Sequence, residues 1–349
     1  MLDKIFLAML VFIPVTAIGS FLHLSPSILF FLSALAIVPL AKYIGEGTEE
    51  LAVYTGPAVG GLLNATFGNA TEFIISIFAL QAGLVEVVKA SITGAIIGNL
   101  LLVLGTAMFV GGWNRKKQEF NKTASMATGS TLLLAVIALV IPAIFLLTAP
   151  KAGSMVIEEL SIFVSVFMIV LYIASIFFTL VTHKHLYAEE VGKAEANWSK
   201  AKSLLVLIFA TVGVAWMSEI LVSSIEPIVK SLGWTELFIG IVVVAVVGNA
   251  AEHTSAIVMA MKNKMDLAIQ VSVGSATQIV MFVAPLLVML SLFFREPMSL
   301  IFNTFELIAI VLSVLIVNFV VEDGESNWLE GLQLMMAYAI IAVAFFFHP

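Results

Sequence analysis

Two similar five-residue sequence motifs, called words below, lie one in each half of the 349-residue chain. Each places a carboxylate inside a long apolar run. The words are Gly-Asn-Ala-Thr-Glu at 68–72 and Gly-Asn-Ala-Ala-Glu at 248–252. An ionised carboxylate at the centre of a bilayer costs at least about 2.5 kcal/mol, so it persists there with a function or a partner. If Glu72 and Glu252 meet, one divalent cation or two protons would neutralise them equally well. We therefore expect the pair to bind a cation and protons alternately; the alternative is a purely structural role.

Mutual repulsion between the two glutamates suggests how such a site would work. Two bare carboxylates a few ångströms apart in a low dielectric repel each other strongly. This repulsion should hinder movement of the empty site and so couple cation movement in one direction to proton movement in the other.

Neutral oxygen ligands are also required, because Ca²⁺ takes six to eight oxygen ligands in loose geometry and two carboxylates are too few. Gly68 and Gly248 can break a helix and free backbone carbonyls toward a cavity. Asn69 and Asn249 precede the glutamates by three residues, which predicts that each shares the helical face of its own glutamate. For the asparagines, the alternative is hydrogen bonding between helices without ion contact.

A second, looser correspondence follows each word, where Asn99 in the first half matches Gln278 in the second. These amides would either contact the ion or orient the glutamates.

The composition indicates an integral membrane protein, because 61% of residues are hydrophobic and 11% are charged, against about 25% charged in soluble domains. Apolar runs of roughly 20 residues predict helices rather than barrel strands, so the fold class is all-α and polytopic. The absence of cysteine excludes disulfides and thiolate chemistry. We expect no cofactor beyond transported ions and no nucleic acid partner, while the apolar exterior suits lipid and a homo-oligomer alike.

Polar, Gly and Pro residues divide the sequence into eleven apolar runs. These runs predict eleven transmembrane helices, at about 3–20, 25–43, 56–81, 85–111, 124–149, 158–182, 202–223, 235–261, 265–294, 300–321 and 328–347. The first run also resembles a cleaved signal peptide, but Pro14 and the missing small-residue ending favour a retained helix. Lys and Arg gather in cytoplasmic loops. A cytoplasmic N-terminus and an external C-terminus satisfy this rule, leaving only four basic residues outside: Lys89, Lys151, Lys230 and Arg295.

The predicted domains are an extra N-terminal helix at 1–22, a five-helix repeat at 23–182, a cytoplasmic connection at 183–201 and a second five-helix repeat at 202–349. An odd number of helices per repeat inverts the second repeat relative to the first, a plan found in secondary transporters with a binding site at mid-membrane. The connection is expected to be a solvated linker; regulatory cation binding is the alternative.

Four further glutamates lie near helix ends on the two sides of the membrane in this topology. They could draw cations toward the site, or they could simply be solvated: Glu46 and Glu50 on the cytoplasmic side, Glu219 and Glu226 on the external side.

The sequence resembles the Ca²⁺/H⁺ antiporters, or cation/proton exchangers, of the Ca²⁺/cation antiporter superfamily. Four words carry the resemblance, which covers essentially the whole chain: 60–72, 101–105, 248–253 and 274–279. It implies that Glu72 and Glu252 carry Ca²⁺ and protons, that the Gly-Asn-Ala segments lend carbonyls, and that Asn99 and Gln278 line the site. Lack of a long polar N-terminal extension resembles bacterial members, which implies the plasma (inner) membrane.

We therefore expect a transporter rather than an enzyme, one that exports cytosolic Ca²⁺ against H⁺ by alternating access. Coupling to Na⁺ or K⁺ is the nearest alternative, although the neutral Asn99 and Gln278 leave few fixed charges to hold several Na⁺ ions. A passive cation channel is a further alternative. An intramembrane hydrolase is disfavoured, because the chain has no His-Glu-x-x-His word and no cysteine.

Overall fold

The computed structural model describes residues 2–55, 57–151, 153–183 and 196–348, and these residues are almost entirely helical. Eight helical stretches of the described residues, several of them made of consecutive helices named below, are long and apolar enough to cross a membrane, or nine if the pair interrupted at Asn249 counts as one span. The expected all-α, polytopic class is therefore found. The count of eleven remains a prediction, since the shorter apolar helices α5 (Ala70–Gln81) and α18 (Thr304–Val320) fall below that length.

The chain forms two compact units, and each unit combines segments from both halves of the sequence. The first comprises Met1–Ser91 and Phe178–Ala251, and the second comprises Ile92–Phe177 and Glu252–His348. Each predicted repeat is a continuous stretch of sequence, so the repeats do not coincide with the two units. Most of the predicted connection at 183–201 lies outside the described residues.

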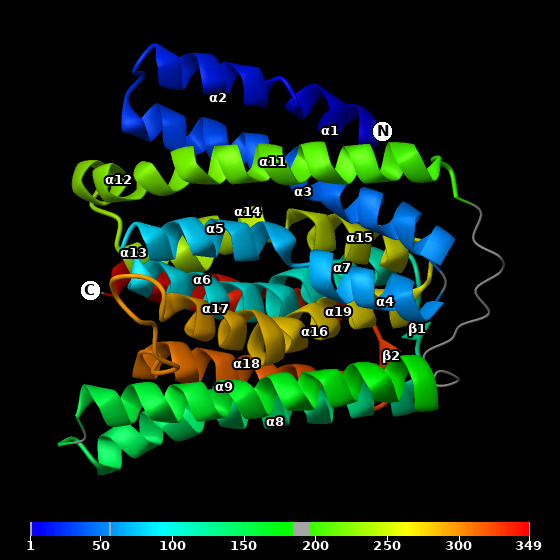
Figure 1. Cartoon of the computed structure of the whole chain (residues 1–349). Helices are drawn as coiled ribbons and strands as arrows, with labels where there is room; N and C mark the ends of the chain where they lie inside the picture. The colour runs from blue at the N-terminus through cyan, green and yellow to red at the C-terminus, as the bar shows by residue number, and fades with distance from the viewer. Residues whose placement is uncertain (1, 56, 152, 184–195, 349) are drawn as a thin grey trace. The chain divides into compact units, whose positions relative to one another are not determined.

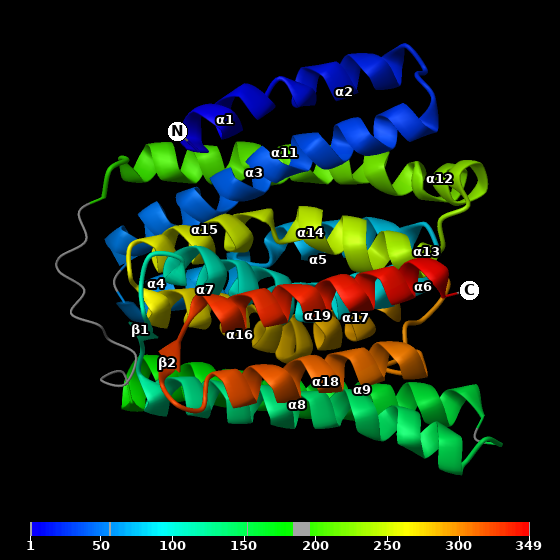
Figure 2. The same cartoon turned by 180° about the vertical axis from the view of Figure 1, so that it is seen from behind.

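The first unit contains α1 (Leu2–Met9), α2 (Phe12–Phe21), α3 (Pro26–Thr55), α4 (Pro57–Phe67), α5, the start of α6 (Val85–Ile97), the π-helix η2 (Phe178–Thr182), α11 (Lys200–Ser223), α12 (Ile225–Leu232), α13 (Glu236–Phe238), the π-helix η3 (Ile239–Val244) and α14 (Ala245–Gly248). Helices α3 and α11, far apart in sequence, lie side by side along much of their length (Figures 1 and 2). Helix α5 packs on α11, and α14 packs on both α3 and α5. This packing brings parts of the two sequence words together.

The predicted first helix packs against α3 as two short helices, α1 and α2. Phe6 is buried, and the Lys42 ammonium lies 5.1 Å from its ring centroid. Helix α3 itself continues to Thr55, well past the predicted end at residue 43. The Lys42–Glu46 ion pair, four residues apart, helps to stabilise this polar extension of the helix. A hydropathy pattern does not predict such a pair.

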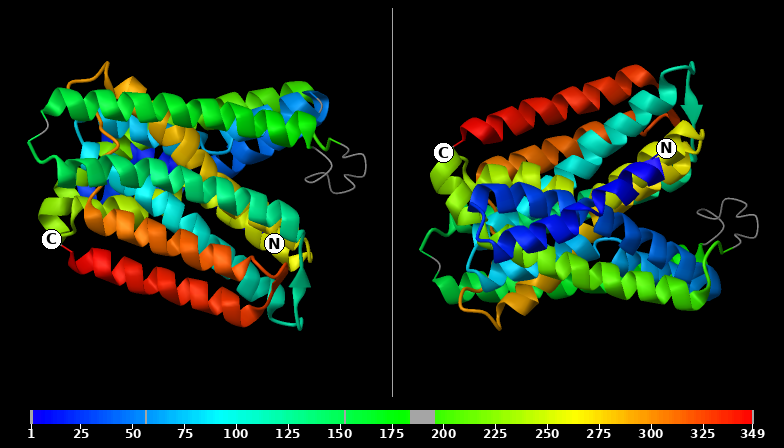
Figure 3. Two further views of the ribbon diagram at one scale, coloured as in Figure 1. Left: turned by 90° about the horizontal axis from the view of Figure 1, so that it is seen from below. Right: turned by 90° about the horizontal axis from the view of Figure 1, so that it is seen from above.

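The second unit contains the end of α6, the π-helix η1 (Gly98–Val103), α7 (Leu104–Gly112), β1 (Gln118–Glu119), α8 (Lys122–Thr148), α9 (Ser154–Phe177), α15 (Ala250–Met261), α16 (Met265–Gln278), the π-helix η4 (Ile279–Val283), α17 (Ala284–Ser291), α18, β2 (Glu325–Ser326) and α19 (Trp328–Phe347). Helices α8 and α9 run side by side, as do α18 and α19 in orange and red (Figure 3). The two short strands pair antiparallel, with Gln118 opposite Ser326.

Polar caps and small residues define these helices locally. Asn303 and Asn327 form capping boxes at the starts of α18 and α19. Gly331 of α19 faces α7 so closely that a Cβ there would meet the Gly105 carbonyl oxygen at 2.6 Å. Such small-residue contacts let membrane helices approach without a hydrophobic driving force between them.

Candidate functional site

Both sequence words adopt the same interrupted-helix conformation. Asn69 has φ −98° and ψ 20°, and Asn249 has φ −96° and ψ 18°, near the sparsely populated bridge region. A new helix begins directly afterwards, at Ala70 and at Ala250. Glu72 and Glu252 therefore lie in the first turn of a helix, where the macrodipole favours a negative charge.

The asparagine of each word lies at the helix interruption. Asn69 and Asn249 directly precede the helices that carry Glu72 and Glu252. That each asparagine shares a helical face with its own glutamate stays a prediction. Asparagine side chains compete for backbone hydrogen bonds, which favours them at helix ends over helix interiors.

In the first unit, Asn249 of the second word bonds Glu72 of the first. The Asn249 amide Nδ2 donates to Glu72 Oε1 and also, over 2.8 Å, to the Ala245 carbonyl oxygen. Asn249 is 1% exposed and Glu72 is 4% exposed, so the contact is shielded from solvent. Asn69 is likewise buried in this unit.

Gly248 leaves the space that the Glu72 side chain occupies. A Cβ on Gly248 would lie 2.6 Å from Glu72 Cγ, closer than non-bonded carbon atoms approach. The glycine in the second word is thus required by packing against the carboxylate of the first.

The second unit contains the remaining candidates, Glu252, Asn99 and Gln278. Asn99 lies fully buried in η1, and its Nδ2 donates to Ser275 Oγ over 3.1 Å. Gln278 is the last residue of α16, directly before η4, and is half-buried, as is Glu252 in α15. π-Helical turns are rare and are frequently found at functional sites. Both amide candidates therefore lie at such turns.

Open space lies beside Gly98 and Gly274. A Cβ built on either glycine would meet nothing within 4 Å beyond its chain neighbours and its own helix backbone. Gly98 immediately precedes Asn99, and Gly274 immediately precedes Ser275. Sequence reasoning includes Ser275 only as part of a family word and assigns it no contact.

The structure thus joins Glu72 with Asn249 in one unit and Asn99 with Ser275 in the other. The convergence of Glu72 and Glu252 on one site stays a prediction. A carboxylate that sequence reasoning missed is also buried in the second unit, Glu306 of α18. The signal that could have found it is a charged residue near the start of an apolar helix.

Three of the four glutamates near the helix ends form ion pairs or hydrogen bonds, and the fourth is exposed. Glu46 pairs with Lys42 at 2.6 Å, and Glu226 approaches Lys230 at 3.4 Å. Glu50 accepts hydrogen bonds of 3.0 Å from the Asn197 side chain and the Trp198 backbone, and Glu219 is exposed on α11. A role in drawing cations toward the site remains a prediction for all four.

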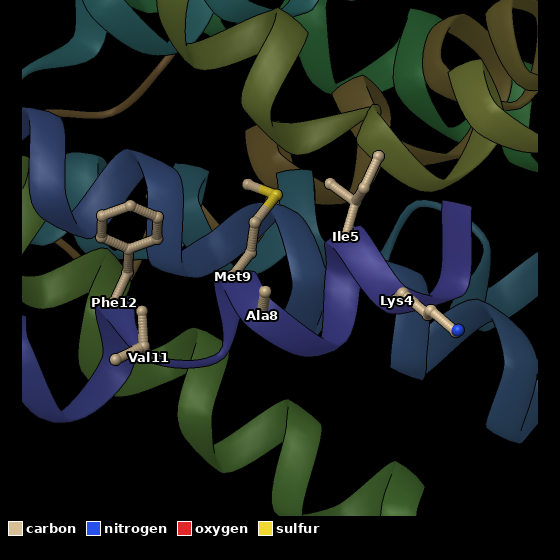
Figure 4. A pocket seen from close by; sticks show the side chains of 6 residues that line it. All are labelled: Lys4, Ile5, Ala8, Met9, Val11 and Phe12. Atoms are coloured by element: carbon tan, nitrogen blue, oxygen red, sulfur yellow. The ribbon is translucent and has the colours of Figure 1, made fainter. Parts of the chain in front are cut away.

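A surface pocket over α1 and the start of α2 contains none of the predicted site residues. Its walls are largely hydrocarbon, which suits acyl chains rather than ions. The side chains in Figure 4 are those of Lys4, Ile5, Ala8, Met9, Val11 and Phe12.

These features define a class, a polytopic helical membrane protein that buries carboxylates and amides at interruptions of its spans. The sodium/calcium exchanger protein family matches residues 25–181 and 202–347. A Ca²⁺/H⁺ antiporter of Synechocystis sp. is 47% identical over 365 residues, which cover 99% of this chain and 98% of the relative. The Ca²⁺/H⁺ antiporter ChaA of Bacillus subtilis is 47% identical over 340 residues, 96% of each chain.

A solved structure has a similar fold. The structure of native YfkE matches with a TM-score of 0.88 and 44% identity, covering 98% of this chain and 100% of that one. The chain belongs to the sodium/calcium exchanger protein family.

Proposed function

We propose that this protein is a secondary active antiporter that exports cytosolic Ca²⁺ in exchange for H⁺. Relatives that are 47% identical over nearly their whole length bear the name Ca²⁺/H⁺ antiporter, which favours protons over Na⁺ or K⁺ as the counter-ion. The observation that carries the proposal is the buried hydrogen bond between Asn249 and Glu72, because it joins the two words around an intramembrane carboxylate.

The proposed mechanism uses Glu72 and Glu252 as shared carriers. Either Ca²⁺ or protons neutralise the pair, and only the neutralised site changes the side to which it opens. Bare carboxylates would repel each other in the membrane interior, so the empty site stays where it is and slippage is suppressed. Alternating access then exchanges the two cargoes.

Neutral oxygens complete the proposed coordination of Ca²⁺. Asn69 and Asn249, Asn99 and Gln278 carry amide oxygens, and the backbone at Gly68 and Gly248 adjoins the helix interruptions. These hard, uncharged donors match the preference of Ca²⁺ for oxygen ligands. With only two carboxylates in the set, protons compete for the same groups that hold the ion.

We further propose eleven spans arranged as one extra helix and two inverted repeats. The two family matches, at 25–181 and 202–347, support repeats at 23–182 and 202–349. The matching dihedral angles of Asn69 and Asn249 support it as well, and so do the π-helical turns beside Asn99 and Gln278.

Contacts within each unit support the predicted assignment of helix ends and loops to the same side of the membrane, and the basic residues predict which side is cytoplasmic. The hydroxyl oxygens of Ser27, near the external end of the predicted span 25–43, and of Ser231, in a loop predicted to be external, lie 3.3 Å apart. Glu50 and Trp198, both predicted to be cytoplasmic, are hydrogen-bonded. The paired strands β1 and β2 join two loops that are also predicted to be cytoplasmic.

Transport in proteoliposomes tests the proposal. Vesicles with an acidic lumen should accumulate radioactive calcium when the outside is alkaline, and dissipating the pH gradient should stop uptake. A Na⁺ gradient should not substitute. Calcium uptake that follows Na⁺ and ignores the pH gradient would sink the proton claim.

Charge-removing substitutions test the carriers. Glu72→Gln and Glu252→Gln should each abolish exchange while the protein still inserts and elutes as a folded species. Glu159→Gln, at an exposed glutamate of α9, serves as the matched control and should transport normally. Substantial exchange by either carrier variant would show that the pair is not the shared carrier.

A further inference from the structure

Glu306 is a third carboxylate inside the apolar helices, and the transport scheme does not use it. It lies in the first turn of α18 and is 1% exposed. Its Oε1 accepts a hydrogen bond of 2.9 Å from the hydroxyl of Thr93, on the neighbouring helix α6. Its Oε2 accepts one of 2.9 Å from the backbone N–H of Asn303. Thr93 is fully buried, so the bond between the helices is shielded from solvent.

Both carboxylate oxygens of Glu306 accept hydrogen bonds from the surrounding structure. One donor is a side chain on a second helix, and the other is the backbone at the start of the helix that carries Glu306. Breaking a buried hydrogen bond leaves a polar group without its partner, which costs about 1–3 kcal/mol. These two bonds therefore fix the Glu306 side chain and tie the first turn of α18 to α6. Glu306 is suited to an anchor between two helices.

The anchored helix touches the segment that carries Asn99. Helix α18 packs against η1, and η1 continues directly from α6, which carries Thr93. A π-helical turn has poorer intrinsic stability than an α-helix, so its neighbours must hold it in place. The bond between Thr93 and Glu306 fixes the first turn of α18 against the same helix that leads into η1.

We propose that Glu306 is a positioning residue: an anchor that, through Thr93, holds α18 against η1 and so places Asn99 for Ca²⁺. This inference rests on the proposed function, because it takes Asn99 as part of the ion site. The group positioned is the amide, and the carriers of protons remain Glu72 and Glu252.

A second capping box supplies a matched control. Glu330 in the first turn of α19 accepts a hydrogen bond of 3.1 Å from the backbone of Asn327, and its own N–H donates to Asn327 Oδ1 over 3.2 Å. These two hydrogen bonds are local to one helix start, whereas Glu306 also bonds a second helix. Comparison of the two glutamates separates cross-helix anchoring from helix capping.

The experiment measures Ca²⁺ KM, maximal rate and pH profile in proteoliposomes for wild type, Glu306→Gln, Thr93→Val, Thr93→Ser and Glu330→Gln. Loss of a buried hydrogen bond between the two helices predicts a KM for Ca²⁺ raised about fivefold or more in Glu306→Gln and Thr93→Val. The maximal rate and the pH profile should be largely retained. Thr93→Ser keeps the hydroxyl and should restore the wild-type KM, and Glu330→Gln should behave as wild type.

Several results would overturn the anchor. A shifted pH profile in Glu306→Gln would make Glu306 a proton carrier, and an equal KM change in Glu330→Gln would reduce it to a helix cap. An unchanged KM in Thr93→Val, a nearly isosteric variant that should fold, would show that the bond positions nothing. If the wild-type protein itself does not exchange Ca²⁺ for H⁺, the proposed function fails instead.

Discussion

The residue pair at the centre of the proposed site is Glu72 with Asn249, contributed by different words of the sequence. The Asn249 side chain also bonds the carbonyl of Ala245, so its amide is oriented by its own helix end while it reaches the carboxylate. Gly248 completes the arrangement by leaving room for the glutamate. The glycine thus provides space, the asparagine orients the carboxylate, and the glutamate supplies the charge.

Gly248→Ala tests the space at this scale. The added Cβ would lie 2.6 Å from Glu72 Cγ, so the carboxylate must move. Overpacking costs about 1–3 kcal/mol, and at about 1.4 kcal/mol per tenfold we expect Ca²⁺ exchange to fall roughly tenfold or more. Gly45→Ala is the control, because its Cβ would meet the Ala251 Cβ at an ordinary 3.6 Å. Near-normal exchange by Gly248→Ala would contradict the packing role.

The sequence indicated candidate site residues more readily than the contacts between them. A charged residue in an apolar run stands out in composition, and this identified Glu72 and Glu252. The bond from Asn249 to Glu72 depends on how α14 packs on α5, which no local pattern encodes. Glu306 was missed because a carboxylate near the start of an apolar run resembles an ordinary helix cap.

At the scale of elements, a small polar assembly ties α15, the helix of Glu252, to the start of β1. Gln118 is 2% exposed, and its Nε2 donates to the Ala260 carbonyl over 2.9 Å and to Asn263 Oδ1 over 3.0 Å. Arg115 adds a bond of 3.1 Å to the Met261 carbonyl. The end of α15 is therefore held by side chains from a distant loop.

Gln118→Ala should loosen this attachment. It removes one buried and one partly buried hydrogen bond, so we expect the free energy of unfolding to fall by about 1–3 kcal/mol and the melting temperature to fall by a few degrees. A thermal-shift measurement on the purified protein in detergent checks this. Gln81→Ala, at the exposed end of α5, should melt as wild type. Equal melting of both variants would argue against a structural attachment at Gln118.

Hydropathy located the helices but not all their ends or interruptions. The predicted span at 56–81 is two helices, α4 and α5, because the chain turns at Gly68 and Asn69. The strand pair involves only two residues on each side, too few for a periodic signal. The strand pair depends on contact between two loops that are distant in the sequence, and such a contact leaves no local pattern.

At the scale of the whole molecule, the orientation of the chain decides which loops, and which mouth of the proposed site, face the cytoplasm. The basic residues predict it, and the contacts between loops bear only on which loops share a side. The natural absence of cysteine makes it directly testable, because every introduced thiol is the sole one in the chain.

Single-cysteine labelling provides that test. Lys116→Cys and Glu296→Cys replace exposed loop residues on opposite predicted sides. A membrane-impermeant thiol reagent should label Glu296→Cys in intact cells and Lys116→Cys only in inverted vesicles. The reverse pattern would place the N-terminus outside and would contradict the predicted topology.

The most direct test of the central claim is whether Ca²⁺ and protons compete for Glu72 and Glu252. Purified protein in a weakly buffered solution is titrated with Ca²⁺ across a range of pH, and proton release is followed with an indicator dye. Ca²⁺ affinity should fall as pH falls, because protonation of the carboxylates removes the charge that holds the ion. Binding should release protons, and Glu72→Gln or Glu252→Gln should abolish that release. A Ca²⁺ affinity that does not change with pH, with no protons released, would contradict the shared-carrier mechanism.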